Sequence, residues 1–355
     1  MTARIVATYH VRSDATAIAA RAQAIAVEQS VEMPLSAIED SGVLAEIVGR
    51  VEDISDIGAG KFAVRVGLAA ATVGNDAGQL LNMLFGNSSL HDDLSLVDID
   101  LPRSMTAAFP RPRHTIHVAD RALTCSALKP QGLPSAALAD LCARLARGGL
   151  DFIKDDHGLA DQAFSPFAAR VSACAAALRS VATEQGHAAR YIPSLSGDLD
   201  AMRRQARLAR DEGIDCLMLA PMIAGVATMT RLVSEFPAMA FFAHPALGGA
   251  ARIAPELLIG KLFPLFGADG VIFPTHGGRF GYSPATCRAL AENARALGAI
   301  PLPAGGISLS RVPEILDFYG PATMLLIGGS LLDAKARLTE ETARFTRAVA
   351  AHVFR

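Results

Sequence analysis

Short apolar runs alternate with longer amphipathic segments from about residue 120 onward, and this alternation restricts the fold more than any other feature of the chain. Parallel strands need helical crossovers, so alternating strands and helices indicate a parallel sheet. Eight such units in about 220 residues predict an α/β fold of the (β/α)8 TIM barrel type, with a doubly wound open sheet as the alternative. The predicted strands are 123–128, 152–155, 191–195, 216–220, 238–244, 270–274, 300–304 and 324–327.

The N-terminal third lacks this regular alternation of strands and helices. It predicts a smaller α+β domain over residues 1–118, ahead of a barrel domain over 119–355. A proline- and arginine-rich stretch, 110–114, is typical of a linker between the two. The strands expected here are 4–10, part of 38–51, and 61–68, and the helices are 16–27 and 77–85.

Composition limits the classes of function. The chain has 355 residues, 51% of them hydrophobic, and a net charge of −2, so it can build a large core. Nothing attracts it to nucleic acid or to an anionic membrane. Neither a membrane-spanning apolar stretch nor a signal peptide is visible in the sequence.

The five cysteines are far apart and form no CxxC motif, which predicts a reduced, cytoplasmic protein. Most of them have the apolar surroundings of small buried residues. Cys125 lies in a predicted strand near the candidate site, so a nucleophilic role is the alternative to simple burial.

Charged residues collect where several predicted barrel strands end. Active sites of (β/α)8 barrels lie at the carboxyl ends of the strands. Lysine is rare in this chain, with five residues, yet Lys129 ends the first strand and Lys154 lies at the end of the second, just before Asp156 and His157. His244 ends the fifth strand. These residues predict an active site, and a solvated loop or a buried core histidine is the structural alternative.

Glycine pairs follow the last two strands, and they predict a phosphate site. The pairs are Gly305-Gly306 and Gly328-Gly329. Barrel enzymes often bind phosphate through backbone N–H groups after strands 7 and 8, although tight turns need glycine in any case. In the loop after the sixth strand, His276 and Arg279 are further candidates to bind substrate, or they are ordinary surface residues.

This set of side chains allows enediolate chemistry on a phosphorylated keto-sugar or sugar acid. A carboxylate and an imidazole on one strand end can hold a divalent metal that polarises a carbonyl. Imidazole suits zinc, manganese, iron or cobalt better than magnesium. A desolvated lysine beside acids is a candidate base for removing a proton next to that carbonyl.

Residues 148–156, GGLDFIKDD, resemble a motif of the RuBisCO large-chain superfamily, and the chain is most similar to its RuBisCO-like (form IV) branch over nearly its whole length. The resemblance implies a ferredoxin-like N-terminal domain before the barrel. It also implies that Lys154 is carbamylated by CO2 and binds Mg together with Asp156. Lys129 would transfer protons at the substrate, His244 would be an active-site histidine, and the glycine pairs would bind phosphate.

The chain departs from the family pattern at several of these positions. His157 replaces the metal-binding glutamate, so that Mg is only one possible metal. Gln131 replaces a second lysine, Pro245 a phosphate-binding arginine, and Ala304 a serine. The mobile lysine of carboxylases is missing, because no lysine occurs between Lys261 and Lys335.

Two N-terminal residues imply a homodimer with shared active sites. By the resemblance, Asn87 and Glu28 match residues that reach the active site of a neighbouring subunit.

The sequence therefore predicts an enzyme that enolises a phosphorylated sugar substrate and does not fix CO2. Since family enolases of methionine salvage keep the glutamate that His157 replaces, decarboxylation or related C–C cleavage is favoured over enolase or isomerase chemistry on methylthioribulose phosphates. Three alternatives remain. The protein is an enolase or isomerase of methylthioribulose phosphates, a true carboxylase, or a binding or regulatory protein that kept only the fold.

Overall fold

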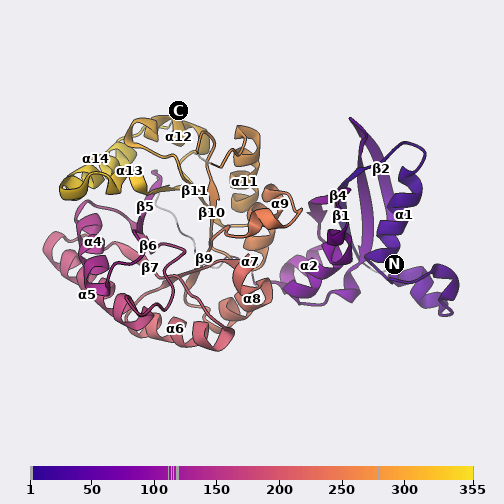
Figure 1. The fold of residues 1–355 in the computed structure, drawn as a ribbon, viewed down its shortest axis with the longest axis horizontal. Helices are drawn as coiled ribbons and strands as arrows, with labels where there is room; N and C mark the ends of the chain where they lie inside the picture. Colours follow the sequence, from indigo (N-terminus) through magenta and orange to yellow (C-terminus); the bar gives the residue numbers. More distant parts are fainter. Residues whose placement is uncertain are drawn as a thin grey trace.

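The computed structural model describes residues 3–110, 112, 114, 116, 120–278 and 280–354. Two sheets organise the chain, a small antiparallel sheet near the N-terminus and a larger parallel sheet in the rest (Figure 1). The predicted boundary at residues 118 and 119 falls in a stretch where several residues are not described, so it stays a prediction.

The N-terminal sheet has the strand order β2-β3-β1-β4, and all of its neighbouring strands are antiparallel. Helix α1 lies between β1 and β2 in the sequence, and helix α2 lies between β3 and β4. This βαββαβ arrangement is the ferredoxin-like fold, as the resemblance implied. The strands are β1 (Arg4–Arg12), β2 (Arg50–Gly58), β3 (Lys61–Ala69) and β4 (Leu94–Asp100).

The prediction of a strand within 38–51 was wrong over most of its length. Asp40 accepts hydrogen bonds from the backbone N–H groups of Gly42 and Val43, and this cap starts a helical turn instead. Strand β4 was missed although Leu94, Leu96 and Ile99 are buried along it. The helical elements of this region are α1 (Ile18–Glu28), η1 (Leu35–Ala37), η2 (Val43–Ile47), η3 (Ala70–Thr72), α2 (Ala77–Phe85), η4 (Asn87–Leu90) and α3 (Arg103–Ala108).

The large sheet is a barrel of eight parallel strands in the order β7-β6-β5-β12-β11-β10-β9-β8. A parallel bridge between Ser194 and Met218 joins the outer two, β7 and β8, and nearly closes the ring. This confirms the predicted (β/α)8 barrel. The strands are β5 (Leu123–Leu128), β6 (Phe152–Asp155), β7 (Arg190–Ile192), β8 (Cys216–Leu219), β9 (Ala240–Ala243), β10 (Gly270–Pro274), β11 (Ile300–Ala304) and β12 (Met324–Ile327).

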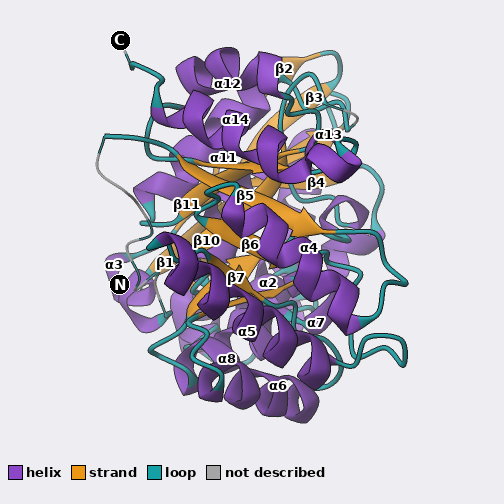
Figure 2. Cartoon of the chain, turned by 90° about the vertical axis from the view of Figure 1, so that its left-hand side faces the viewer, coloured by secondary structure: helices purple, strands orange, loops and turns teal. Residues whose placement is uncertain are grey.

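Helices surround the barrel strands, and Figure 2 shows α4 and α5 in front of β5, β6 and β7. None of the helices in the described part of the chain is long and apolar enough to cross a bilayer. The larger helices are α4 (Ser135–Arg147), α5 (Phe167–Gln185), α6 (Leu199–Asp211), α8 (Val226–Glu235), α11 (Pro284–Ala296), α12 (Val312–Tyr319) and α14 (Leu338–Ala350). The short ones are α7 (Pro221–Ala224), η5 (Gly248–Ala250), α9 (Pro255–Leu257), η6 (Leu258–Leu262), α10 (Phe263–Leu265), η7 (Leu309–Arg311), α13 (Gly329–Leu332) and η8 (Lys335–Arg337).

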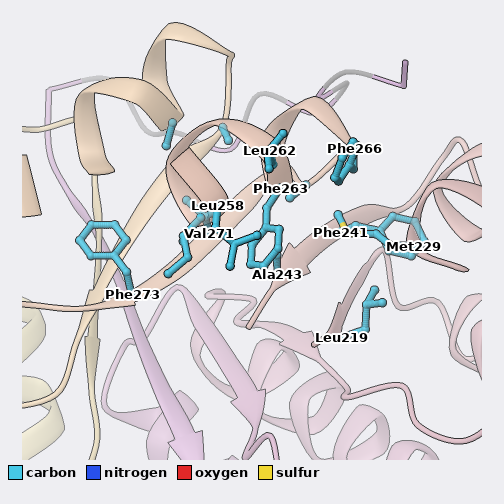
Figure 3. Packing of buried hydrophobic residues seen from close by; sticks show 14 of the residues in the cluster. Leu219, Met229, Phe241, Ala243, Leu258, Leu262, Phe263, Phe266, Val271 and Phe273 are labelled. Carbon is cyan, nitrogen blue, oxygen red and sulfur yellow. The ribbon is translucent and has the colours of Figure 1, made fainter. Parts of the chain in front are cut away.

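The core has two parts, because strand residues point alternately into the barrel and toward the helices. Cys125, Phe152 and Phe242 belong to the cluster that fills the barrel interior. Phe241 and Val271, with the opposite alternation, pack against the helical segment that contains Leu258 and Phe263 (Figure 3). Since both faces of each strand are buried, the strands are almost continuously apolar.

The N-terminal domain is anchored to the barrel through strand β4. Leu96 exchanges backbone hydrogen bonds of 2.9 Å with Arg252 and Ala254, as an added strand would. The Lys261 ammonium lies 2.5 Å from the Asp98 carboxylate beside this contact. The joint therefore combines main-chain pairing with an ion pair.

Candidate active site

The alternation of strand residues brings three of the predicted site residues to the mouth of the barrel. Lys154 is two positions after the interior residue Phe152, and His244 is two after Phe242. Lys129 continues the interior row of β5 that includes Cys125. Because strand ends in a parallel barrel lie on one face, these side chains share the mouth.

Asp156 connects the two sides of the cluster. Its Oδ1 lies 3.0 Å from the Lys129 Nζ and 3.2 Å from the His157 Nδ1. Burial by itself would raise the pKa of this carboxyl, but the hydrogen bonds from His157 and Lys129 outweigh burial and hold the pKa well below its usual value. Asp156 is therefore a carboxylate at neutral pH.

Lys154 is almost completely buried, and its Nζ donates a 2.7 Å hydrogen bond to the carbonyl oxygen of Asp155. Burial lowers the pKa of its ammonium, although the nearby acids Asp156 and Asp155 partly oppose the effect. A lysine whose pKa is lowered can supply a neutral amine, which can act as a base or react with CO2.

His244 is held in its neutral form. Burial, followed by the charge of Lys154, lowers its pKa to about 2. Its Nδ1 accepts a 3.2 Å hydrogen bond from the backbone N–H of Ala246, so the ring proton is on Nε2. The ring stacks on that of His157, with 4.2 Å between the ring centres and 10° between the planes. His244 can therefore donate a hydrogen bond without carrying a charge.

Asp155 has a structural role, because it points to the helix side of the barrel wall. It is fully buried and accepts hydrogen bonds from Arg170 (3.1 Å), Tyr191 (2.5 Å) and the Ser194 backbone (3.1 Å). Arg170 also donates to the carbonyl oxygens of Ala160 and Ser165 in the loop that follows the cluster. Sequence analysis missed this network, which fixes the strand end that carries Lys154.

The glycine pairs lie at the same face, as predicted. Gly305 and Gly306 have φ angles of 76° and 73°, and a Cβ on Gly306 would lie 2.8 Å from the Cα of Gly278, so glycine is required there. Gly328 and Gly329 begin α13 and have open space around them. Phosphate binding by these pairs stays a prediction.

The other predicted residues lie elsewhere or play a different part. The His276 ring packs against Phe318, 4.4 Å between ring centres, so the structure turns it toward α12 and does not join it to the lysine cluster. Arg279 lies outside the described residues. Burial raises the pKa of the Cys125 thiol to about 12, so Cys125 is a core residue and not a thiolate nucleophile.

Asn87 and Glu28, predicted to serve a neighbouring subunit, contact each other in the N-terminal domain. The Asn87 side-chain amide donates to the Glu28 carboxylate at 3.0 Å and to that of Glu32 at 2.7 Å. Sequence analysis missed Glu32, because only the folded chain brings this residue, with its left-handed φ of 53°, beside Asn87.

Comparison with known proteins decides the family. Residues 110–280 match the family of the ribulose bisphosphate carboxylase large chain, catalytic domain. The chain is 58% identical to 5-methylthioribulose-1-phosphate isomerase of Rhodospirillum rubrum, over 99% of this chain and 97% of that protein. The chain belongs to the RuBisCO-like branch of the RuBisCO large-chain family.

Other relatives of this RuBisCO-like protein agree with the resemblance seen in its motifs. It is 31% identical to 2,3-diketo-5-methylthiopentyl-1-phosphate enolase of Microcystis aeruginosa, over 82% of this chain and 77% of that one. Its fold matches the crystal structure of a RuBisCO-like protein from Rhodopseudomonas palustris with a TM-score of 0.92 and 51% identity, over the full length of both chains.

The side chains of this RuBisCO-like protein fit a metal only under one condition. No group of three or more His, Cys, Asp or Glu side chains in the described part of the chain is arranged to hold a metal ion. At the mouth, Asp156 and His157 supply only two candidate ligands. A carbamate on Lys154 would add a third, anionic ligand beside them, so CO2 addition would have to come first.

Proposed function

We propose that this RuBisCO-like protein isomerises a phosphorylated keto-sugar through an enediolate, and that 5-methylthioribulose 1-phosphate or a close analogue is its substrate. The single observation that supports this most is the pair of lysines around Asp156, one buried with a lowered pKa and one held by a carboxylate. An isomerase needs such a pair, since one group must take a proton from carbon and another must stabilise the oxygen. The Rhodospirillum rubrum relative supports the choice of substrate and favours isomerisation over C–C cleavage.

Each residue has a defined part in this reaction. Lys154 removes the proton from the carbon next to the carbonyl, and the C–H electrons form the enediolate double bond while the carbonyl oxygen becomes negative. Lys129 and the Nε2–H of His244 donate hydrogen bonds to that oxygen. The proton of the neighbouring hydroxyl group passes to the negative oxygen, and the proton on Lys154 is returned to the former carbonyl carbon. The carbonyl is then on the neighbouring carbon, and the isomerisation is complete without loss of CO2. The glycine pairs hold the phosphate through backbone N–H groups.

Lys154 can also serve as a carbamate, in which case a carbamate oxygen is the base. With Asp156 and His157 it would then hold a divalent metal, Mg or a metal that accepts imidazole more readily. A bound metal would polarise the substrate carbonyl.

The test is an assay of purified protein with 5-methylthioribulose 1-phosphate, with and without bicarbonate and Mg or Mn, followed by NMR of the sugar carbons and by measurement of released CO2. We expect an isomeric sugar phosphate with no CO2. Stimulation by bicarbonate and metal together would assign the carbamate form, and turnover without them would assign the amine form. Release of CO2 from a keto-acid phosphate, with no isomerisation, would instead favour a decarboxylase. Binding of the sugar phosphate without turnover would favour a binding protein.

We also propose a cytoplasmic homodimer in which Asn87 and Glu28 complete the active site of the partner subunit. The five cysteines are buried and unpaired, which supports a reducing compartment. The exposed position of the Asn87 cluster leaves it available to a second subunit.

Mixing two inactive variants tests the shared site. Asn87→Ala and Lys154→Ala are each expected to be inactive, whereas co-refolded mixtures should regain about a quarter of wild-type activity, since half of the dimers are mixed and each mixed dimer has one intact site. Sites formed within one subunit would give no recovery. A mixture of Lys129→Ala with Lys154→Ala is the control, because both residues lie on the same barrel and every site stays damaged.

A further inference from the structure

The mouth of the barrel carries exposed apolar side chains on the side away from the glycine pairs. Among the described residues, Phe164, Ile223 and Leu247 are large, apolar and 42%, 63% and 58% exposed. They follow strands β6, β8 and β9. The glycine pairs follow β11 and β12, which lie opposite β7 and β8 in the ring of eight strands. Strands β6 and β9 are the neighbours of β7 and β8 on either side. Exposed side chains of this size on one rim of an active site indicate an apolar contact.

Leu247 is unusual for a second reason. Its backbone is left-handed, with a φ of 62°, a conformation that is costly for a branched side chain and that glycine adopts freely. The turn is fixed by a 2.9 Å hydrogen bond from the Gly248 N–H to the Pro245 carbonyl oxygen. The turn begins at His244, whose Nδ1 accepts the Ala246 N–H. A strained, exposed leucine three residues from an active-site histidine suggests that its side chain is used.

The loops after β8 and β9 carry no charged side chain. Residues 217–230 and 237–251 contain no Asp, Glu, Lys or Arg, and these segments include the loops after β8 and β9. A second phosphate would find no charged partner in these two loops, whereas an uncharged apolar group would need none.

We propose that Leu247, assisted by Ile223, binds an apolar substituent at the end of the substrate remote from the phosphate, and that this contact selects a thioether over a hydroxyl group at that end. The inference rests on the proposed function, because it assumes a sugar phosphate held at the glycine pairs. The two relatives named above act, by their names, on compounds with a methylthio group at carbon 5 and a phosphate at carbon 1.

The experiment compares two probes that differ at one carbon, 5-methylthioribulose 1-phosphate and ribulose 1-phosphate. Both kcat/KM and the dissociation constant are measured for wild type, Leu247→Gly and Leu247→Asn. Glycine and asparagine both tolerate the left-handed backbone, so the fold of the loop is kept. We expect the preference for the methylthio probe to fall about tenfold in each variant, the size expected for lost apolar contact in a binding pocket. Val353→Gly, which removes another exposed apolar side chain, should leave the preference unchanged.

The outcomes separate this inference from the proposed reaction. If neither probe is turned over but wild type binds the methylthio probe more tightly and the Leu247 variants do not, the proposed reaction fails and the apolar contact stands. If wild type binds both probes equally, or the variants keep the full preference, the inference is overturned. A variant that keeps the preference but shows weaker self-association by sedimentation also overturns it, and assigns Leu247 to a contact with a second copy of the chain.

Discussion

Lys154→Met is expected to abolish turnover while making the protein harder to unfold. Activity should fall by about 10²- to 10⁴-fold, because the variant has neither an amine nor a carbamate to act as base. The gain in stability follows from burial, which lowers the pKa of Lys154 in the folded chain below its value of 10.5 in the unfolded chain. Below pH 10.5, Lys154 binds a proton more fully in the unfolded chain than in the folded chain, so the wild-type lysine opposes folding.

The pH dependence of the free energy of unfolding checks the sign. The advantage of Lys154→Met should be present at neutral pH, should shrink as the pH approaches 10.5, and should vanish well above 10.5, where the lysine is neutral in both states. Urea unfolding at several pH values measures it. Lys261→Met is the matched control, since that lysine is partly exposed and paired with Asp98, and its loss should leave stability unchanged or slightly lower. A Lys154 variant that is destabilised at neutral pH would show that the wild-type lysine is charged and paired in the folded protein.

Among the variants described here, Arg170→Met is expected to lower the free energy of unfolding most, by about 3–5 kcal/mol. Both side chains of the Arg170–Asp155 pair are fully buried, so the variant leaves the Asp155 carboxyl without its cation. Burial already raises the pKa of Asp155, and removing Arg170 should raise the pKa further. The loss should therefore become smaller as the pH is lowered and Asp155 takes up a proton.

Two further variants test this explanation. Arg147→Met breaks an exposed pair with Glu184 and should cost less than about 1 kcal/mol. Adding Asp155→Asn to Arg170→Met removes the buried charge as well, so the double variant should recover part of the stability. An equal loss in Arg170→Met and Arg147→Met, or no recovery in the double variant, would rule out a cost due to an unpaired buried charge.

Sequence patterns were sufficient for the barrel and insufficient for part of the N-terminal domain. Strands such as β10 and β12 were predicted at their true bounds, because a strand buried on both faces is a continuous apolar run between polar segments. Strand β2 was missed beyond Val51, because it lies at the edge of its sheet and is mostly exposed and acidic. Within 38–51, in part of which a strand was expected, only Arg50 and Val51 belong to a strand, because the local cap by Asp40 competes with extended structure in the rest.

The sequence by itself determined the barrel and the strand ends at which the candidate site residues lie, since alternation along a strand is a local property. Lys129, Lys154 and His244 could be assigned to one face from their position at strand ends. Only the tertiary structure decided which neighbours share that face. Asp155 and Asp156 are adjacent in the chain, yet one pairs with Arg170 behind the barrel wall and the other with Lys129 at the mouth. The stacking of His157 on His244 and the packing of His276 against α12 also depend on contacts between distant segments, whose distances and burial no sequence pattern encodes.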